Sequence, residues 1–114
     1  MIYALECVGM RREPYSGHLD LLLLAALARG PLHGYAIIER IRDTSSQRFD
    51  YPEGTVYPAL HRLEGDGLLR SGWGDVDGRR RRTYELTPLG TQALEGRRRD
   101  WEHFTASVQA VLEQ

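Results

Sequence analysis

Lysine, cysteine and long apolar runs are scarce in this 114-residue sequence, and their scarcity excludes several classes of protein. Cys7 is the single cysteine, so a disulfide within the chain is excluded and the reducing cytoplasm is the expected location. The longest apolar stretch, LDLLLLAALA at residues 19–28, is shorter than the roughly 18 residues that a membrane span needs, and it is not placed like a signal peptide. The length predicts one domain with a modest core.

Motifs that carry catalysis are also missing. The four histidines have no metal-ligand spacing with Cys7 or with each other; they are His18, His33, His61 and His103. No nucleophile motif or phosphate-binding loop is present. We therefore expect no enzyme activity, no metal and no cofactor.

The distribution of charge is more informative than its sum, which is −1. All 15 basic residues are arginine, a composition that a GC-rich genome can also produce. Two clusters stand out, at residues 79–82 and 97–99, whereas the acidic residues are spread more evenly.

Hydrophobic periodicity, together with the glycine and proline residues between segments, predicts three helices, then a β-hairpin, then a fourth helix. The first helix begins near residues 16–18, is apolar on nearly all sides and ends at Gly30-Pro31. A second helix covers residues 33–45, and residues 45–53 form a loop. Asp and Gly in GDVDG, at residues 74–78, indicate a hairpin with a five-residue turn. A long helix follows over residues 88–112, with Thr87 as its N-cap.

The predicted fold class is therefore mainly α with a small β-hairpin, a winged helix-turn-helix followed by a long C-terminal helix. The expected domains are a DNA-binding domain at residues 16–87 and a dimerisation helix at residues 88–114. Two interpretations of residues 1–15 stay open. They form an extension with an extra strand or helix, or the chain starts at Met10 and residues 1–9 do not belong to the protein.

The stretch EGTVYPALHRLEGDGLL, at residues 53–69, predicts a third helix that contains a proline. If Gly54 caps this helix, Pro58 is one of the first four residues and loses no hydrogen bond, and Gly67 ends the helix. Val56, Leu60 and Leu63 form the core face. The opposite face carries groups that can contact phosphates or base edges, with Tyr57 at its margin: Thr55, Pro58, His61 and Arg62. An ordinary solvated face is the alternative.

The arginines after the hairpin turn favour a nucleic-acid partner. Alternation along a strand directs Arg79 and Arg81 to one face and Arg80 and Arg82 to the other. A cationic hairpin tip suits phosphate or minor-groove contacts, which need little geometric precision. A solvated run of charge is the alternative.

An apolar stripe follows the last helix. Leu94, Trp101 and Val108 recur every seven residues, Phe104 and Val111 extend the stripe, and Arg97 interrupts it. Two interpretations are open, in which the stripe packs on the chain's own body or pairs with the same helix of a second identical chain.

Three segments in this order resemble the PadR-like transcriptional regulators: GPLHGYAIIERI, GTVYPALHRLEGDGLL and GRRRRTYELTPLG. The resemblance covers about residues 17–101. It implies a dimeric winged-helix repressor that binds pseudo-palindromic operators, often of an ATGT…ACAT kind. It also implies that Tyr35 touches the DNA backbone, that the third helix faces DNA through Thr55, Tyr57, Pro58 and His61, and that the arginines after Gly78 form the wing.

The same resemblance implies a role for Trp101. In multidrug-sensing relatives a tryptophan of the last helix meets its counterpart across the dimer axis and stacks on planar aromatic ligands. Trp101 stands at the matching distance after LTPLG, and the tail ends at Gln114 as in short-tailed members, whereas the N-terminal extension departs from the family. We therefore expect a homodimeric DNA-binding repressor with a planar aromatic effector. The alternative is a winged-helix protein-interaction module that does not bind DNA.

Overall fold

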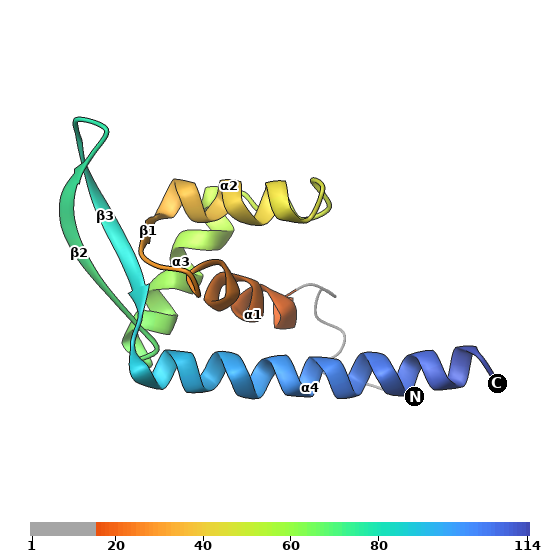
Figure 1. Cartoon of the computed structure of the whole chain (residues 1–114). Helices are drawn as coiled ribbons and strands as arrows, with labels where there is room; N and C mark the ends of the chain where they lie inside the picture. The colour runs from red at the N-terminus through yellow and green to blue at the C-terminus, as the bar shows by residue number, and fades with distance from the viewer. Residues whose placement is uncertain (1–15) are drawn as a thin grey trace.

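The computed structural model describes residues 16–114, and both interpretations of residues 1–15 lie outside this part of the chain. The elements follow the predicted order, with one short strand added: α1 (Ser16–Ala26), β1 (Leu32–His33), α2 (Gly34–Thr44), α3 (Glu53–Gly65), β2 (Leu69–Val76), β3 (Arg79–Leu86) and α4 (Pro88–Leu112). The predicted fold class is confirmed. Figure 1 shows the three short helices grouped on one side of α4, with the β2–β3 hairpin extending beyond them.

The core lies where α1, α2 and α3 meet. Each helix contributes aliphatic side chains that are almost fully buried: Leu23, Leu24 and Leu27 near α1, Ile37 and Ile41 on α2, and Val56, Leu60 and Leu63 on α3. The prediction of a central first helix is confirmed, but its predicted end is wrong. The α-helix stops at Ala26, and Leu27, Ala28 and Gly30 continue in tighter turns that bond three residues back. Gly30 follows in the left-handed half of backbone space, with φ of 144°.

The start of α3 corrects the explanation of its proline. Pro52, not Gly54, is the N-cap, and its carbonyl accepts from the amides of Thr55 and Val56 at 3.0 and 3.1 Å. Pro58 therefore lies inside the helix, where its missing N–H deprives the Gly54 carbonyl of an intrahelical donor. Both residues are exposed, so water can reach that carbonyl.

The prediction that Gly67 supplies the left-handed stop after α3 is confirmed by the backbone geometry. Gly67 has a φ of 81°, its amide donates to the Glu64 carbonyl, and the amide of Leu68 donates to the Leu63 carbonyl, each at 3.0 Å. This pair of bonds is a Schellman motif, which ends the helix and turns the chain into β2.

The hairpin is tighter than the sequence predicts. Asp77 and Gly78 alone connect β2 and β3, both with positive φ, so the five-residue turn is wrong. Positive φ at both central residues is the pattern of a type I′ turn, whose twist matches that of paired strands. The unpredicted β1 pairs antiparallel with β3, giving a three-stranded sheet of order β1-β3-β2.

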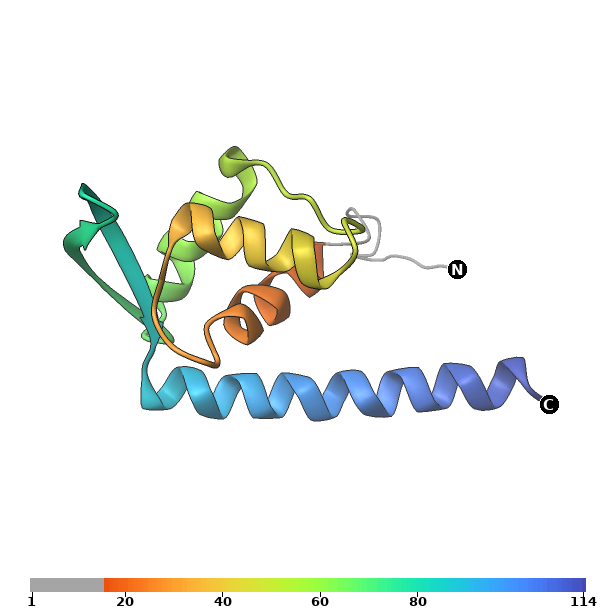
Figure 2. The ribbon, with the colours of Figure 1, turned by 45° about the horizontal axis from the view of Figure 1, so that its top comes forward.

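The bounds predicted for α4 and its cap are confirmed. The Oγ1 of Thr87 accepts from the amide of Gly90 at 3.0 Å and donates to the Gly67 carbonyl at 2.6 Å. Leu94 is buried in the core formed by the other elements. In contrast, residues 101–114 are all exposed, and α4 extends beyond the three-helix body (Figure 2). None of the helices within residues 16–114 is both long and apolar enough to cross a membrane.

Candidate nucleic-acid interface

The outward face of α3 carries the polar residues that the sequence predicts there. Thr55, Pro58 and His61 are exposed, whereas Val56 and Leu60, on the opposite side of the helix, are buried completely. One side of the helix is therefore exposed along its length, and the opposite side packs on the core. The first turn of α3 is the positive end of the helix dipole, and Glu53 lies in that turn.

Tyr57 connects this face to α2. Its ring lies over Gly34, where a Cβ atom would overlap the ring atoms Cε1 and Cζ and the hydroxyl oxygen. Tyr57 keeps 38% of its surface exposed, and Tyr35 in the first turn of α2 keeps 43%. Two phenols from two helices are thus exposed at this part of the surface.

The environment of Tyr57 disfavours ionisation of its hydroxyl. Burial raises its pKa above the usual 10.0, the negative charge of Glu53 and the charge of Tyr84 act in the same direction, and Arg81 opposes them. The hydroxyl is therefore a hydrogen-bond donor at neutral pH, suited to an anionic oxygen.

The hairpin, which we call the wing (residues 69–86), holds two of its arginines near one aromatic ring. Register pairs Trp73 with Arg82 and Asp75 with Arg80, so these four side chains share one face. The guanidinium carbons of Arg80 and Arg82 lie 5.9 and 5.7 Å from the Trp73 ring centroid. Both distances allow cation–π attraction, and 58% of Trp73 is exposed.

Arg82 is also linked to α3 by hydrogen bonds through Ser71. Its Nε donates to the Oγ of Ser71 at 2.9 Å, and that hydroxyl donates to Glu64 at 2.8 Å. The guanidinium of Arg82 lies 3.9 Å from the other carboxylate oxygen of Glu64. The wing arginines therefore differ, because Arg82 belongs to a polar network that holds the wing against α3, while Arg79 and Arg80 are exposed near the tip.

A hollow of about 310 Å³ separates the wing from α3 and the start of α2. It brings together Tyr57 and three of the wing arginines, together with residues that the sequence prediction did not select; its lining is His33, Gly34, Tyr57, Trp73, Arg80, Arg81, Arg82 and Tyr84. Within residues 16–114, the Nε of Arg81 is buried and has no hydrogen-bond partner.

Trp73 and His33 are the main residues that the sequence prediction missed. Counting outward from a two-residue turn at Asp77-Gly78 would have placed Trp73 opposite Arg82. The assumption of a longer turn concealed that pairing. His33 carries no local signal, because it reaches the hollow through the two-residue strand β1.

Arg62 is paired with α1 in this structure while 53% of its side chain stays exposed, and its assignment as a DNA contact stays a prediction. Its two terminal nitrogens donate to the carboxylate of Asp20 on α1 at 2.9 and 2.8 Å. The side chain is therefore directed from α3 toward α1, where Asp20 takes up both donors.

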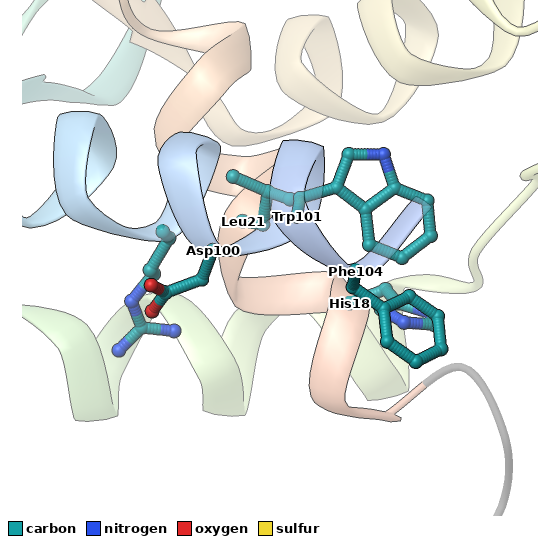
Figure 3. A pocket seen from close by; sticks show the side chains of 6 residues that line it. His18, Leu21, Asp100, Trp101 and Phe104 are labelled. Atoms are coloured by element: carbon teal, nitrogen blue, oxygen red, sulfur yellow. The ribbon is translucent and has the colours of Figure 1, made fainter. Parts of the chain in front are cut away.

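A second hollow, of about 280 Å³, lies between α1 and α4 (Figure 3). Its walls are His18 and Leu21 from α1 and four residues of α4: Arg97, Asp100, Trp101 and Phe104. The His18 and Trp101 rings meet edge to face with centroids 4.9 Å apart, and those of Trp101 and Phe104 are 5.8 Å apart. Leu94 does not take part, because it is buried in the chain's own core, so its assignment to a dimer or effector surface is wrong.

Beyond Trp101, the apolar stripe of α4 is uncovered. Phe104, Val108 and Val111 are 40 to 64% exposed. The interpretation that this stripe packs on the chain's own body therefore holds for Leu94 and fails for the residues after Trp101.

Three helices, with a β-hairpin beside the third, define a winged helix-turn-helix protein. The model of the Transcriptional regulator PadR-like family matches residues 23–96, and the chain belongs to that family of transcriptional regulators. It is 39% identical over 97 residues to Transcriptional regulator Rv3488 of Mycobacterium tuberculosis, covering 85% of this chain and 88% of the relative.

Solved structures support the same assignment. A PadR family transcription regulator from Clostridium difficile is 31% identical, with a TM-score of 0.76 over 84% of this chain and 99% of that one. A PadR family transcriptional regulator from Eggerthella lenta is also 31% identical, with a TM-score of 0.76 over 93% of this chain and 91% of that one.

Proposed function

We propose that the protein is a repressor that binds a pseudo-palindromic operator as a homodimer, inserting the N-terminal half of α3 into the major groove. The observation that carries this proposal is the hollow between α3 and the wing, which is lined by Tyr57 of α3 and by the wing arginines Arg80, Arg81 and Arg82. The phenol hydroxyl and the guanidinium groups that line this hollow are donors suited to phosphate oxygens. The exposed Thr55, Pro58 and His61 then face the base edges.

The wing supplies charge to this interface. Arg79 and Arg80 are exposed near its tip, and Trp73 limits the orientations of Arg80 by holding its guanidinium over the ring. Contacts of this kind add affinity for any sequence and position the recognition helix, whereas α3 selects the sequence.

Two copies joined through α4 would present two α3 helices to one duplex. The exposed Phe104, Val108 and Val111 form the apolar seam for this dimer, continuing from Trp101. Half-sites would then lie about one helical turn, roughly 10 base pairs, or a multiple of it apart.

The proposal is tested by fluorescence anisotropy with a labelled duplex from the chain's own promoter, at several salt concentrations. We expect saturable binding by the dimer that weakens steeply as salt rises, because phosphate contacts release counterions. Absence of binding at low salt, or equal affinity for a shuffled duplex, would contradict it and favour the protein-interaction module.

Substitution of the wing arginines separates the two roles within this site. Replacing Arg80 and Arg81 together with alanine should weaken binding to all duplexes alike and reduce the salt slope by about one for each phosphate that the wing no longer neutralises. Arg70→Ala is the matched control, because Arg70 lies on the same hairpin paired with Glu85 at 2.8 Å. An unchanged slope in the double variant would remove the wing from the interface.

A planar aromatic effector is a second proposed feature, supported by the aromatic wall of His18, Trp101 and Phe104 in the α1–α4 hollow. A ligand there would change DNA affinity only if it prefers one arrangement of the two subunits. Titration with proflavine, a planar cation, and 2-naphthoate, a planar anion, should quench Trp101 in a Trp73→Phe background. Equal quenching in a Phe104→Ala variant would contradict binding at this wall.

A further inference from the structure

One carboxylate joins three helices beside the hollow of Trp101. Asp20 lies on α1 and accepts a two-pronged hydrogen bond from Arg62 of α3, at 2.9 and 2.8 Å. The Nη1 of Arg97, on α4, lies 3.6 Å from the same carboxylate. Only 14% of the Asp20 side chain is exposed, whereas 53% of the Arg62 side chain and 40% of the Arg97 side chain are exposed, so water screens the arginine side of both interactions.

The two arms of this ion triad differ in kind. Arg62 forms the planar fork that fixes both distance and angle, and the hydrogen bond to Asp20 is the main cause of its raised pKa. Arg97 lies beyond hydrogen-bonding distance, so its attraction to Asp20 is Coulombic and tolerates movement. The α3 arm is therefore rigid, and the α4 arm is adjustable.

The helices joined by the triad have distinct places in the proposed function. α3 carries the face proposed to read DNA, and α4 carries the uncovered seam beyond Trp101. Arg97 also lines the α1–α4 hollow next to Trp101. The carboxylate of Asp20 therefore contacts one arginine of the recognition helix α3 and one arginine of α4, the helix that carries the seam.

We propose that Asp20 is a positioning residue, which fixes the angle of α3 relative to α4 and so sets the placement of the two recognition helices in a dimer. This inference rests on the proposed function. Under this proposal Arg62 links α3 to α1 through Asp20. Arg97, which lines the α1–α4 hollow, transmits a change in that hollow to α3 through the same carboxylate.

The direction in which one substitution changes operator affinity tests this proposal. Asp20→Asn keeps the side-chain volume and removes the charge, and we expect operator affinity to fall roughly fivefold with an unchanged salt slope, because the orientation of α3 changes while every phosphate-binding group is kept. If Arg62 were instead a phosphate ligand restrained by Asp20, the variant would bind more tightly, with a steeper slope. That result would overturn the inference, as would unchanged affinity.

Two further variants show whether the pair acts as a unit. Arg62→Gln removes the rigid arm and leaves the attraction between Asp20 and Arg97, so it should weaken binding by no more than Asp20→Asn, which removes both arms. The double variant should bind no more weakly than Asp20→Asn alone. Asp100→Asn is the control: it removes one carboxylate from the same hollow, and within residues 16–114 Asp100 forms no ion pair with Arg62 or Arg97. Additive losses, or an equal loss in the control, would overturn the inference.

A measurement without DNA keeps this test separate from the proposed function. Spin labels at His61→Cys on α3 and Glu102→Cys on α4, in a Cys7→Ser background diluted with unlabelled chain, report the distance between these helices within one protomer. Asp20→Asn should broaden that distribution while circular dichroism stays unchanged. An equally narrow distribution would overturn the inference even if the wild type binds its operator, and failure of the wild type to bind would overturn the proposed function alone.

Discussion

The ring of Tyr57 covers Gly34, so that α3 and the first turn of α2 touch at a point with no room for a side chain. A Cβ at position 34 would overlap three ring and hydroxyl atoms of Tyr57. Because these atoms are at the far end of one side chain, the ring can move aside while the backbone stays in place. Gly34 therefore determines where the phenol of Tyr57 lies, and through it the shape of the hollow beside the wing.

We expect Gly34→Ala to impair DNA binding more than folding. The displaced Tyr57 should cost roughly fivefold or more in operator affinity, the range of one good contact to DNA, while helix propensity offsets part of the packing strain. Anisotropy and thermal unfolding measure the two effects. Gly65→Ala on α3 is the control, because nothing lies within 4 Å of the added Cβ. Equal affinity of Gly34→Ala and wild type would contradict this account of Tyr57.

Gly90 should tolerate substitution far less well. A Cβ there would overlap the backbone carbonyl of Leu68, which cannot rotate away as a side chain can. We expect Gly90→Ala to lower the free energy of unfolding by about 1 to 3 kcal/mol, the usual cost of overpacking. Urea denaturation measures it. Gly96→Ala, on the same helix with nothing within 4 Å, should instead stabilise by about 0.5 to 1 kcal/mol.

Because the seam of α4 is exposed in the single chain, a substitution there should weaken dimer formation without disturbing the fold of the chain. Val108→Asp should raise the dimer dissociation constant on the order of a hundredfold, because a charge would be buried between two apolar stripes. Its circular dichroism should match that of the wild type, since Val108 is exposed in the single chain. Sedimentation measures the assembly. Ala106→Asp, on the opposite side of the helix, is the control, and an equal loss of dimer there would argue against the seam.

Alkaline pH should weaken the fold through Tyr84. Burial raises its pKa above the usual 10.0, Glu64 acts in the same direction, and Arg82 opposes both. The unfolded chain then releases the proton first, so the stability is fully present below pH 10 and is lost as pH rises above it. Urea denaturation between pH 8 and 11 measures the slope. In Tyr84→Phe the loss should be smaller, and an identical loss would assign it to other groups.

Some parts of the site follow from local sequence. The outward face of α3 is predicted by helical period alone, because one face of a helix on a core must be apolar and the other meets solvent. Thr87-Pro88 predicts the start of α4 for a similar reason, since capping is decided by a few adjacent residues. Asp77-Gly78 could have predicted the tight turn, and with it the pairing of Trp73 with Arg82, had the shorter connection been chosen.

Other parts depend on residues that are distant in the sequence. The hydrogen-bond partner of Arg62 is Asp20, 42 positions away, and helical period could indicate only that the side chain points off the core. The apolar stripe of α4 runs along one helix, yet its first member Leu94 is buried while Phe104 is exposed, because α1 and the rest of the body cover only the beginning of the helix. The proline of α3 lies in the helix interior because the cap is Pro52, earlier in the chain than the predicted Gly54.

The sequence by itself determined the order of elements, the family and the two surfaces of α3, since these follow from short-range periodicity and from motifs. Only the tertiary structure decided which arginines are free, which part of α4 is uncovered and which residues surround the hollow between α3 and the wing. The physical reason is that a side chain's partners are fixed by how helices pack and strands pair, and neither is encoded within a single segment.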